Sequence, residues 1–191
     1  IALLAMMASM PLYADEHESK KNIGTGVMIT AKEGHDKELI EAITAYHKMV
    51  AEFEGHMRYV WYEILTGPDT GKYIAWSGGH SWAEFDAEYD WQEKAGDAFA
   101  NDVAPHIDSV QRWMASSMTE MSHWPESWEG YNMLSIEHWY VKNGHYGQFR
   151  KGLKRIVEAL KAGGYPGYWG FSAIESGGPS NQIPKGCPPD A

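Results

Sequence analysis

The 191-residue sequence contains little cysteine, little positive charge and no apolar run long enough to span a bilayer. Its single cysteine, Cys187, excludes an internal disulfide framework and a cysteine-rich zinc site. Acidic side chains outnumber basic ones by 26 to 16, which gives a formal net charge of −10. A nucleic-acid partner requires clustered Lys and Arg, and a membrane-surface partner requires a basic helix face, so we expect neither.

Apolar side chains are abundant and can build a packed core. They make up 43% of the residues, and aromatic side chains make up 13%, including nine tryptophans. A chain of this length and composition predicts a folded domain, or two small domains that share a core, and not a disordered segment.

The first 14 residues form an apolar, uncharged segment, and the charges begin at Asp15. This pattern is typical of the apolar region of a secretory signal peptide, with the small residue Ala14 before the cut. Leu12 is larger than the residue usually found three positions before a cut. An N-terminal core helix is the alternative, but the segment has no amphipathic face. We therefore predict a partial signal peptide at residues 1–14 and a periplasmic or secreted protein.

Two parts of the chain resemble each other at an offset of 110 residues. Lys32-Glu33-Gly34-His35 recurs as Lys142-Asn143-Gly144-His145, and the same offset pairs Leu39 with Phe149. Few residues are identical, but the order of strand, turn, helix and strand is preserved. A tandem repeat is therefore predicted, with a first unit at 23–124 and a second unit at 130–191.

The apolar periodicity predicts the elements of the first unit. A helix begins at Gly34-His35-Asp36, carries an apolar stripe at three- and four-residue spacing, and ends at Gly55. The capping box at residues 81–84 begins a second helical region that runs past Phe99. Strands are expected at 25–32, 57–66, 72–77 and 118–123. The resulting β-α-β-β-α-β order is the split-βαβ, or ferredoxin-like, motif of an α+β fold.

The second unit begins in the same way and then departs from the pattern. A strand is expected at 131–142, a helix at 145–162 and a strand at 168–175. Prolines and glycines after Ile183 are expected to prevent a further strand. We interpret the second unit as truncated, or as completed by another chain.

Tandem split-βαβ units with a Lys-x-Gly-His turn before the first helix resemble the dimeric α/β-barrel superfamily. The resemblance covers roughly residues 23–177 and is strongest to antibiotic-biosynthesis-monooxygenase-like and NIPSNAP-like proteins. It implies two sheets that face each other as a barrel, with helices outside. It also implies a small ligand, or haem in some branches, bound within each half or between sheet and helices. Members include cofactor-independent oxygenases and proteins with no known activity, so the resemblance implies a fold and not one chemistry.

The expected first strand of the second unit carries a candidate site. His138 and Tyr140 share one face of this strand, and Trp139 lies on the other. The equivalent positions in the first unit are Met28 and Thr30, so polar aromatic groups occur in one half only. An imidazole and a phenol can bind or protonate a ligand, although a hydrogen-bonded structural pair is the alternative.

The expected second strand carries the other candidate ligand-binding residues. Arg58 and Tyr62 share a face and can hold an acidic ligand, while Trp61 and Glu63 share the opposite face and can pack against a flat one. The alternative to ligand binding is an exposed strand surface whose charged side chains pair across the hairpin.

His47 is a third candidate because it lies in the apolar stripe of the first helix. A histidine among leucines and valines needs a hydrogen-bond partner, and it can serve as a base, as a haem ligand or as an ordinary core residue. The repeated His35 and His145 indicate a turn role. His80 and His106 have no partner at metal-ligand spacing, so no metal site is predicted.

Together these features predict a secreted α/β-barrel protein that binds a small apolar or aromatic molecule. If it is catalytic, it is expected to resemble a cofactor-independent monooxygenase, with His138 or His47 as base and Tyr140 or Arg58 positioning the substrate. The alternatives are a haem-binding barrel and a non-catalytic interaction module that assembles as a homodimer.

Overall fold

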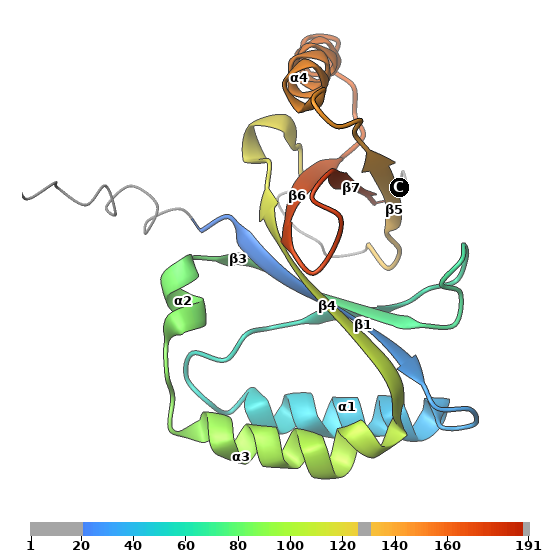
Figure 1. Ribbon diagram of the computed structural model, residues 1–191, viewed down its shortest axis with the longest axis vertical. Helices are drawn as coiled ribbons and strands as arrows, with labels where there is room; N and C mark the ends of the chain where they lie inside the picture. Colours follow the sequence, from blue (N-terminus) through green and yellow to red (C-terminus); the bar gives the residue numbers. More distant parts are fainter. Residues whose placement is uncertain (1–20, 126–130, 189–191) are drawn as a thin grey trace, which may run out of the picture.

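The computed structural model describes residues 21–125 and 131–188. Within these ranges a curled antiparallel sheet has the strand order β2-β3-β1-β4-β6-β7-β5 (Figure 1). The predicted signal segment, 1–14, lies outside the described residues. The strands are β1 (Ile23–Ala31), β2 (Val60–Glu63), β3 (Tyr73–His80), β4 (Ile107–Ser117), β5 (Ser135–Tyr140), β6 (Gly170–Ser176) and β7 (Gln182–Cys187).

The helices lie at two ends of this sheet. α1 (Asp36–Val50) and α3 (Trp91–Ala98) run side by side beneath β1 and β4, and α4 (Tyr146–Ala162) lies at the other end (Figure 1). The short α2 (Trp82–Asp86) precedes α3, which continues through a π-helical turn, Phe99–Val103, into a 3-10 turn, Ala104–His106. The helical region predicted as one segment is therefore divided, because the chain is extended at Ala87. The α+β class is confirmed.

Both long helices begin from the same kind of turn. Gly34 and Gly144 each have a φ of +77°, in the left-handed region that favours glycine. The amide of His35 donates to the carbonyl of Lys32 at 2.9 Å, and the amide of His145 donates to the carbonyl of Lys142 at 3.0 Å. The Lys-x-Gly-His sequence thus closes a turn that aims the chain into a helix.

Two apolar cores occupy the two ends of the molecule. The first centres on Ile29, Leu39 and Val103, between β1, α1 and the segment after α3. The second joins β6, β7 and α4 to the turn after β4 through the buried residues Met121, Val141, Leu153, Val157, Trp169, Phe171 and Ile183. The sheet is continuous, but each end has its own helical cover.

The face of β1 opposite the helices explains its glycines. A Cβ atom at Gly24 would lie 2.0 Å from the ring of Trp76, and one at Gly26 would lie 2.1 Å from the ring of Trp113. The two indoles therefore lie flat on the strand, and any larger residue in β1 would displace them.

The strand predicted at 118–123 is wrong. β4 ends at Ser117, and Thr119–Met121 forms a 3-10 turn. The prediction failed because β4 carries polar, exposed residues on both faces, such as Asp108 and Gln111, and lacks an apolar alternation. Its backbone pairing with β1 on one side and β6 on the other specifies this strand.

The expectation that no strand follows Ile183 is also wrong. β7 includes Pro184, which pairs with His138 of β5. The pairing of β7 with β6 covers only Gly186 and Lys185, so Pro184 lies where that ladder has already ended. A proline is tolerated in a strand at such a position.

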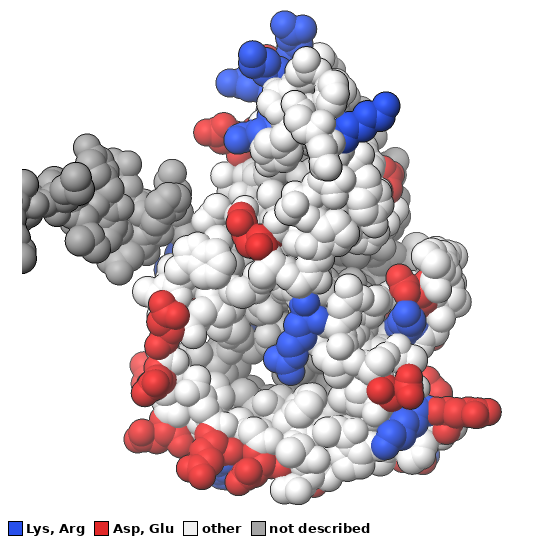
Figure 2. Space-filling view, viewed as in Figure 1, with Lys and Arg blue, Asp and Glu red and all other residues white. Residues whose placement is uncertain are grey.

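The net negative charge is unevenly distributed. Figure 2 shows Lys and Arg gathered over the end that α4 occupies, and Asp and Glu along the end of α1, α2 and α3. α4 alone carries five basic residues: Arg150, Lys151, Lys154, Arg155 and Lys161. None of the helices within residues 21–125 and 131–188 is long and apolar enough to cross a membrane.

We predict that Leu153→Ala destabilises the fold and that Ile156→Ala does not. Leu153 is 4% exposed in the second core, whereas Ile156, on the same helix, is 57% exposed. Truncating a buried leucine costs about 2–5 kcal/mol, and a surface change costs about 0.5 kcal/mol or less. Urea denaturation followed by circular dichroism measures both. An equal decrease in the free energy of unfolding in both variants would contradict the packing of α4.

Candidate functional site

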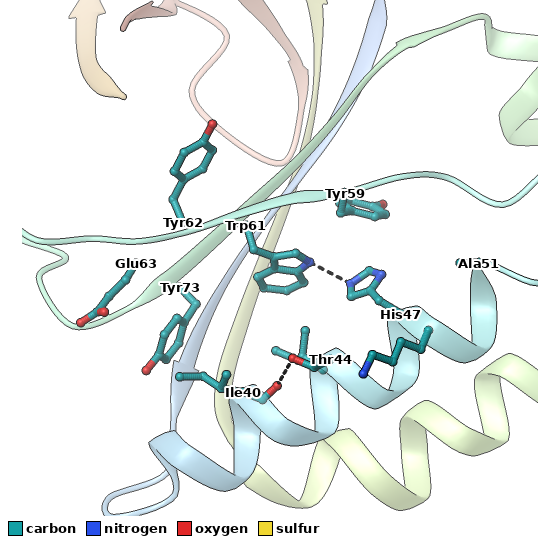
Figure 3. A pocket seen from close by; sticks show the side chains of 11 residues that line it. Ile40, Thr44, His47, Ala51, Tyr59, Trp61, Tyr62, Glu63 and Tyr73 are labelled. Carbon is teal, nitrogen blue, oxygen red and sulfur yellow. Dashed lines mark hydrogen bonds between the residues drawn. The ribbon is translucent and has the colours of Figure 1, made fainter. Parts of the chain in front are cut away.

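An aromatic cleft of about 580 Å³ lies between α1 and β2 (Figure 3). Its volume is within the range of roughly 300–1,000 Å³ that small-molecule sites occupy. Its walls are mainly aromatic and aliphatic, with a few polar groups. The lining residues are Ile40, Ile43, Thr44, His47, Lys48, Ala51, Tyr59, Trp61, Tyr62, Glu63 and Tyr73.

Helical and strand periodicity together place these side chains. Ile40, Thr44 and His47 follow one another at three- and four-residue spacing, so they share the face of α1 that lines the cleft. Trp61 and Glu63 alternate along β2, and Glu63 pairs across the hairpin with Tyr73. Local sequence therefore orders both walls of the cleft.

A hydrogen bond joins the two walls. The indole nitrogen of Trp61 donates to Nε2 of His47 at 2.8 Å (Figure 3). Burial lowers the pKa of His47, with a smaller contribution from His56, so the ring is neutral at pH 7. Because an indole can only donate, Nε2 must hold the lone pair and Nδ1 must carry the proton. His47 therefore presents a hydrogen-bond donor on the side of the ring away from Trp61.

Tyr59 and His47 also line a second cavity, of about 320 Å³. Burial raises the pKa of Tyr59, while a hydrogen bond with Thr25 and the positive charge of Arg112 oppose that rise. The centres of the Tyr59 and His47 rings are 6.2 Å apart. The two side chains form a partition between the cleft and the second cavity, whose other wall comes from α2, α3 and the residues around Tyr89.

The structure brings four of the predicted site residues together. His47, Trp61, Tyr62 and Glu63 line the cleft, whereas the exposed Arg58 is not among its lining residues. The roles assigned to all five stay predictions.

The other predicted residues lie on β5, outside this cleft. Nδ1 of His138 accepts from the side-chain amide of Gln182, burial lowers its pKa, and Asp69 opposes that shift. Tyr140 is 63% exposed. Trp139 packs against the second core, and its indole donates to Glu137 at 2.9 Å. β5 thus provides no enclosed site together with α1 and β2.

Several residues that line the cleft were not predicted as site residues from the sequence. Tyr59 alternates with Trp61 and could have been found from strand periodicity alone. Tyr73 could be found only from the register of the hairpin, which pairs it with Glu63. Ile43 was predicted only as part of the apolar stripe of the first helix, and Thr44 was not singled out. The part of the chain that the structure describes contains no group of three His, Cys, Asp or Glu side chains that could hold a metal ion.

Comparison with solved structures finds the same arrangement of elements in other proteins. A candidate monooxygenase from Lactobacillus acidophilus NCFM matches with a TM-score of 0.59 and 11% identity, covering 88% of this chain and 76% of that one. The chlorite dismutase of Candidatus Nitrospira defluvii matches with a TM-score of 0.56 and 9% identity, covering 90% and 78%. An anthrone oxidase-like protein matches with a TM-score of 0.52 and 12% identity, covering 90% and 74%.

These likenesses define the class of fold. All three proteins have the dimeric α/β-barrel fold, built from ferredoxin-like units, and this chain shares its curled sheet and helices. At identities of 9–12% the likeness shows the fold alone. No family model matches the sequence, and no curated protein matches it.

We predict that His47 titrates below 6.5, the ordinary value for histidine, and that Trp61→Phe raises its pKa. Removing the indole donor frees Nε2 to take a proton. Histidine resonances followed by NMR across pH 4–8 measure both values, and Trp82→Phe, on α2, is the matched control.

The sign of the pH effect on stability follows from the same shift. The unfolded chain takes a proton at His47 more readily than the folded one, so this contribution is full above pH 6.5 and is lost as the pH falls below it. A pKa for His47 that is unchanged in Trp61→Phe would contradict the role of the hydrogen bond.

Proposed function

We propose that this protein binds a flat aromatic molecule in the cleft between α1 and β2. The observation that carries the proposal is the Trp61 indole, which the hydrogen bond to His47 holds in the cleft wall. A fixed indole offers a planar, apolar surface at low entropic cost, and Tyr59 and Tyr73 extend the aromatic lining.

The polar groups of the cleft favour a ligand that carries an acceptor oxygen. Nδ1 of neutral His47 is a donor, and Lys48 adds a positive charge at the lining. The hydroxyl of Thr44 donates to the carbonyl of Ile40 at 2.7 Å, so its proton is already used within the helix (Figure 3). A phenol or a conjugated ketone meets these requirements.

Monooxygenase-like chemistry is the activity we propose for this site. It is supported by the fold shared with a candidate monooxygenase and an anthrone oxidase-like protein. An electron-rich aromatic substrate that has given its acidic proton to water can itself reduce molecular oxygen. One oxygen atom enters the substrate, which loses two hydrogens and two electron pairs in total, and the other oxygen atom leaves as water. A donor such as His47 would stabilise the negative charge that develops on the substrate oxygen. In this tautomer His47 acts as a donor and not as the base.

We also propose the tandem repeat, with units at 23–124 and 130–191. Each unit has a strand, a helix and two further strands in chain order, β1-α1-β2-β3 and β5-α4-β6-β7, and the sheet arranges the equivalent strands alike, as β2-β3-β1 and as β6-β7-β5. The equivalent turns at Gly34 and Gly144 support the same proposal. A periplasmic or secreted location is proposed from the composition of residues 1–14 alone.

The resemblance to the dimeric α/β-barrel superfamily implies haem in some branches. The histidines of the two candidate sites, His47 and His138, do not fit haem. Nε2 of His47 accepts from Trp61 and Nδ1 carries the proton, so neither nitrogen offers a free lone pair. Nδ1 of His138 accepts from Gln182, which leaves its proton on Nε2. An iron ligand needs an available lone pair on a neutral ring. We therefore assign no haem chemistry to either site.

The second hypothesis is a non-catalytic interaction module that assembles as a homodimer. The opposite charges of the α4 end and the α1–α3 end support association between copies (Figure 2).

We predict that anthrone, a tricyclic ketone, binds this protein and that Trp61→Ala weakens binding at least about tenfold, because the stacking surface is lost. Fluorescence titration measures affinity, and an oxygen electrode measures turnover. Trp82→Ala is the matched control, since Trp82 is 41% exposed and lies outside the cleft. Equal affinities for the wild type and Trp61→Ala would exclude this site, whereas binding without oxygen uptake would exclude only the activity.

We predict that haemin added to the protein keeps the spectrum of free haemin. Absorption spectroscopy around the Soret band measures this. A Soret shift that disappears in His47→Ala or His138→Ala would contradict the fit described above and restore the haem-binding alternative.

A further inference from the structure

Three side chains at the end of β3 and the start of α2 form a linear hydrogen-bonded series. Ser77 Oγ lies 2.7 Å from Nε2 of His80, and Nδ1 of His80 lies 3.1 Å from Oε2 of Glu84. We propose that Ser77 is an activated nucleophile, with His80 as its general base and Glu84 as the positioning residue, and that the site hydrolyses small carboxylic esters. This proposal is independent of the aromatic-ligand function.

The direction of each hydrogen bond follows from the carboxylate. A hydrogen bond from Lys21 lowers the pKa of Glu84, with a further contribution from His80, and the Lys21 ammonium lies 2.9 Å from Oε1. Ionised Glu84 can only accept, so Nδ1 of His80 donates to it. In the neutral ring Nε2 then holds the lone pair and accepts from the Ser77 hydroxyl. This is the arrangement that a serine nucleophile, a histidine base and an orienting carboxylate require.

A β-bulge makes this series possible. Residues three apart in a regular strand point to opposite faces, so Ser77 and His80 should not meet. The register of β3 against β1 pairs Gly78 with Gly24 and His80 with Ile23, which leaves Gly79 as an extra residue. Gly79 has a φ of +81°, as the inserted glycine of a bulge does. The bulge turns His80 to the side of Ser77.

The start of α2 supplies the third member. Ser81 is the N-cap of α2, and its hydroxyl accepts from the amide of Glu84. The cap sets the first helical turn directly after His80, so the carboxylate of Glu84 reaches back to the ring. Bulge, cap and helix thus position three groups within an eight-residue segment.

The second cavity lies next to this series. Glu84 and Phe85 line the cavity, and the ring of Phe85 contacts the edge of His80 with ring centres 5.5 Å apart. Ser77 is 2% exposed and does not line the cavity, so a substrate reaches its oxygen only if side chains of the cavity wall move, and Phe85 is the wall residue whose ring contacts His80. The cavity volume of about 320 Å³ suits a short acyl group.

The reaction has two balanced halves. Ser77 Oγ bonds to the ester carbonyl carbon while its proton passes to Nε2 of His80; the bond to the alcohol oxygen then breaks, and the alcohol leaves with that proton. Water next gives a proton to His80 and bonds to the acyl carbon. Ser77 leaves with the proton, and the carboxylic acid is released. No oxidant or cofactor is consumed.

The test is covalent labelling of the full chain with a fluorophosphonate probe, followed by peptide mass spectrometry. We expect an adduct on Ser77 that is absent in Ser77→Ala and that forms at least about 100-fold more slowly in His80→Ala, because the general base is lost. Phe85→Ala should label faster than the wild type, because access to Ser77 widens.

Ser116→Ala is the matched control. The Ser116 hydroxyl donates to a carboxylate of Glu175, so Ser116 lacks a histidine base and should neither be labelled nor alter labelling of Ser77. Thermal melts of every variant show whether it folds.

Two outcomes would overturn the proposal. One is a folded wild type and a folded Phe85→Ala variant that both carry no adduct on Ser77. The other is an adduct on Ser77 that forms equally fast in His80→Ala. In either case the three side chains form a structural link between β3 and α2, and their substitution would lower the melting temperature without changing the rate at which Ser77 is labelled.

Discussion

The pairing of β4 with strands on both sides is the constraint on which the rest of the molecule depends. β4 pairs with β1 along most of its length and with β6 at its end, so this one strand joins the two parts of the sheet. Residues 108–112 of β4 are exposed, so side-chain burial does not fix this part of the strand, and the backbone ladder holds it in place. Because the sheet curls at this seam, each end keeps its own helices and its own apolar core. The cleft between α1 and β2 belongs wholly to the first of these ends.

Within that end, one polar bond sets the character of the cleft. A histidine in an apolar helix stripe would be costly without a partner, and an indole nitrogen would be equally costly in an aromatic wall. The bond between His47 and Trp61 satisfies both groups and fixes the tautomer of the imidazole. The same contact orients the largest flat surface of the cleft. The need to satisfy two polar groups in an apolar wall has therefore also produced a donor, Nδ1 of His47, that can recognise a ligand oxygen.

Local signals in the sequence predicted what local physics determines. The Lys-x-Gly-His turns, the stripe of α1 and the alternation of β2 were predicted from spacing, whereas the contact between His47 of α1 and Trp61 of β2 was not predicted, because it joins two elements that were considered separately. β4 and β7 could not be predicted in this way, because both are specified by partners distant in sequence: β1 and β6 for the polar β4, and β5 for a strand that contains Pro184. Tyr73 joined the cleft only through its register with Glu63. The elements and residues that were not predicted all depend on which strands pair with each other, and a single sequence does not specify that pairing.

The Ser77–His80–Glu84 series shows the same limit within eight residues. In a regular strand Ser77 and His80 would point to opposite faces, and the sequence showed no partner for His80 at metal-ligand spacing. The inserted Gly79 reverses that conclusion, because one residue of bulge shifts the alternation by one and brings the two side chains to the same face. Gly79, the second of two adjacent glycines, is the residue that builds the series. A glycine inside a strand pattern therefore marks the place where side-chain alternation can no longer be assumed.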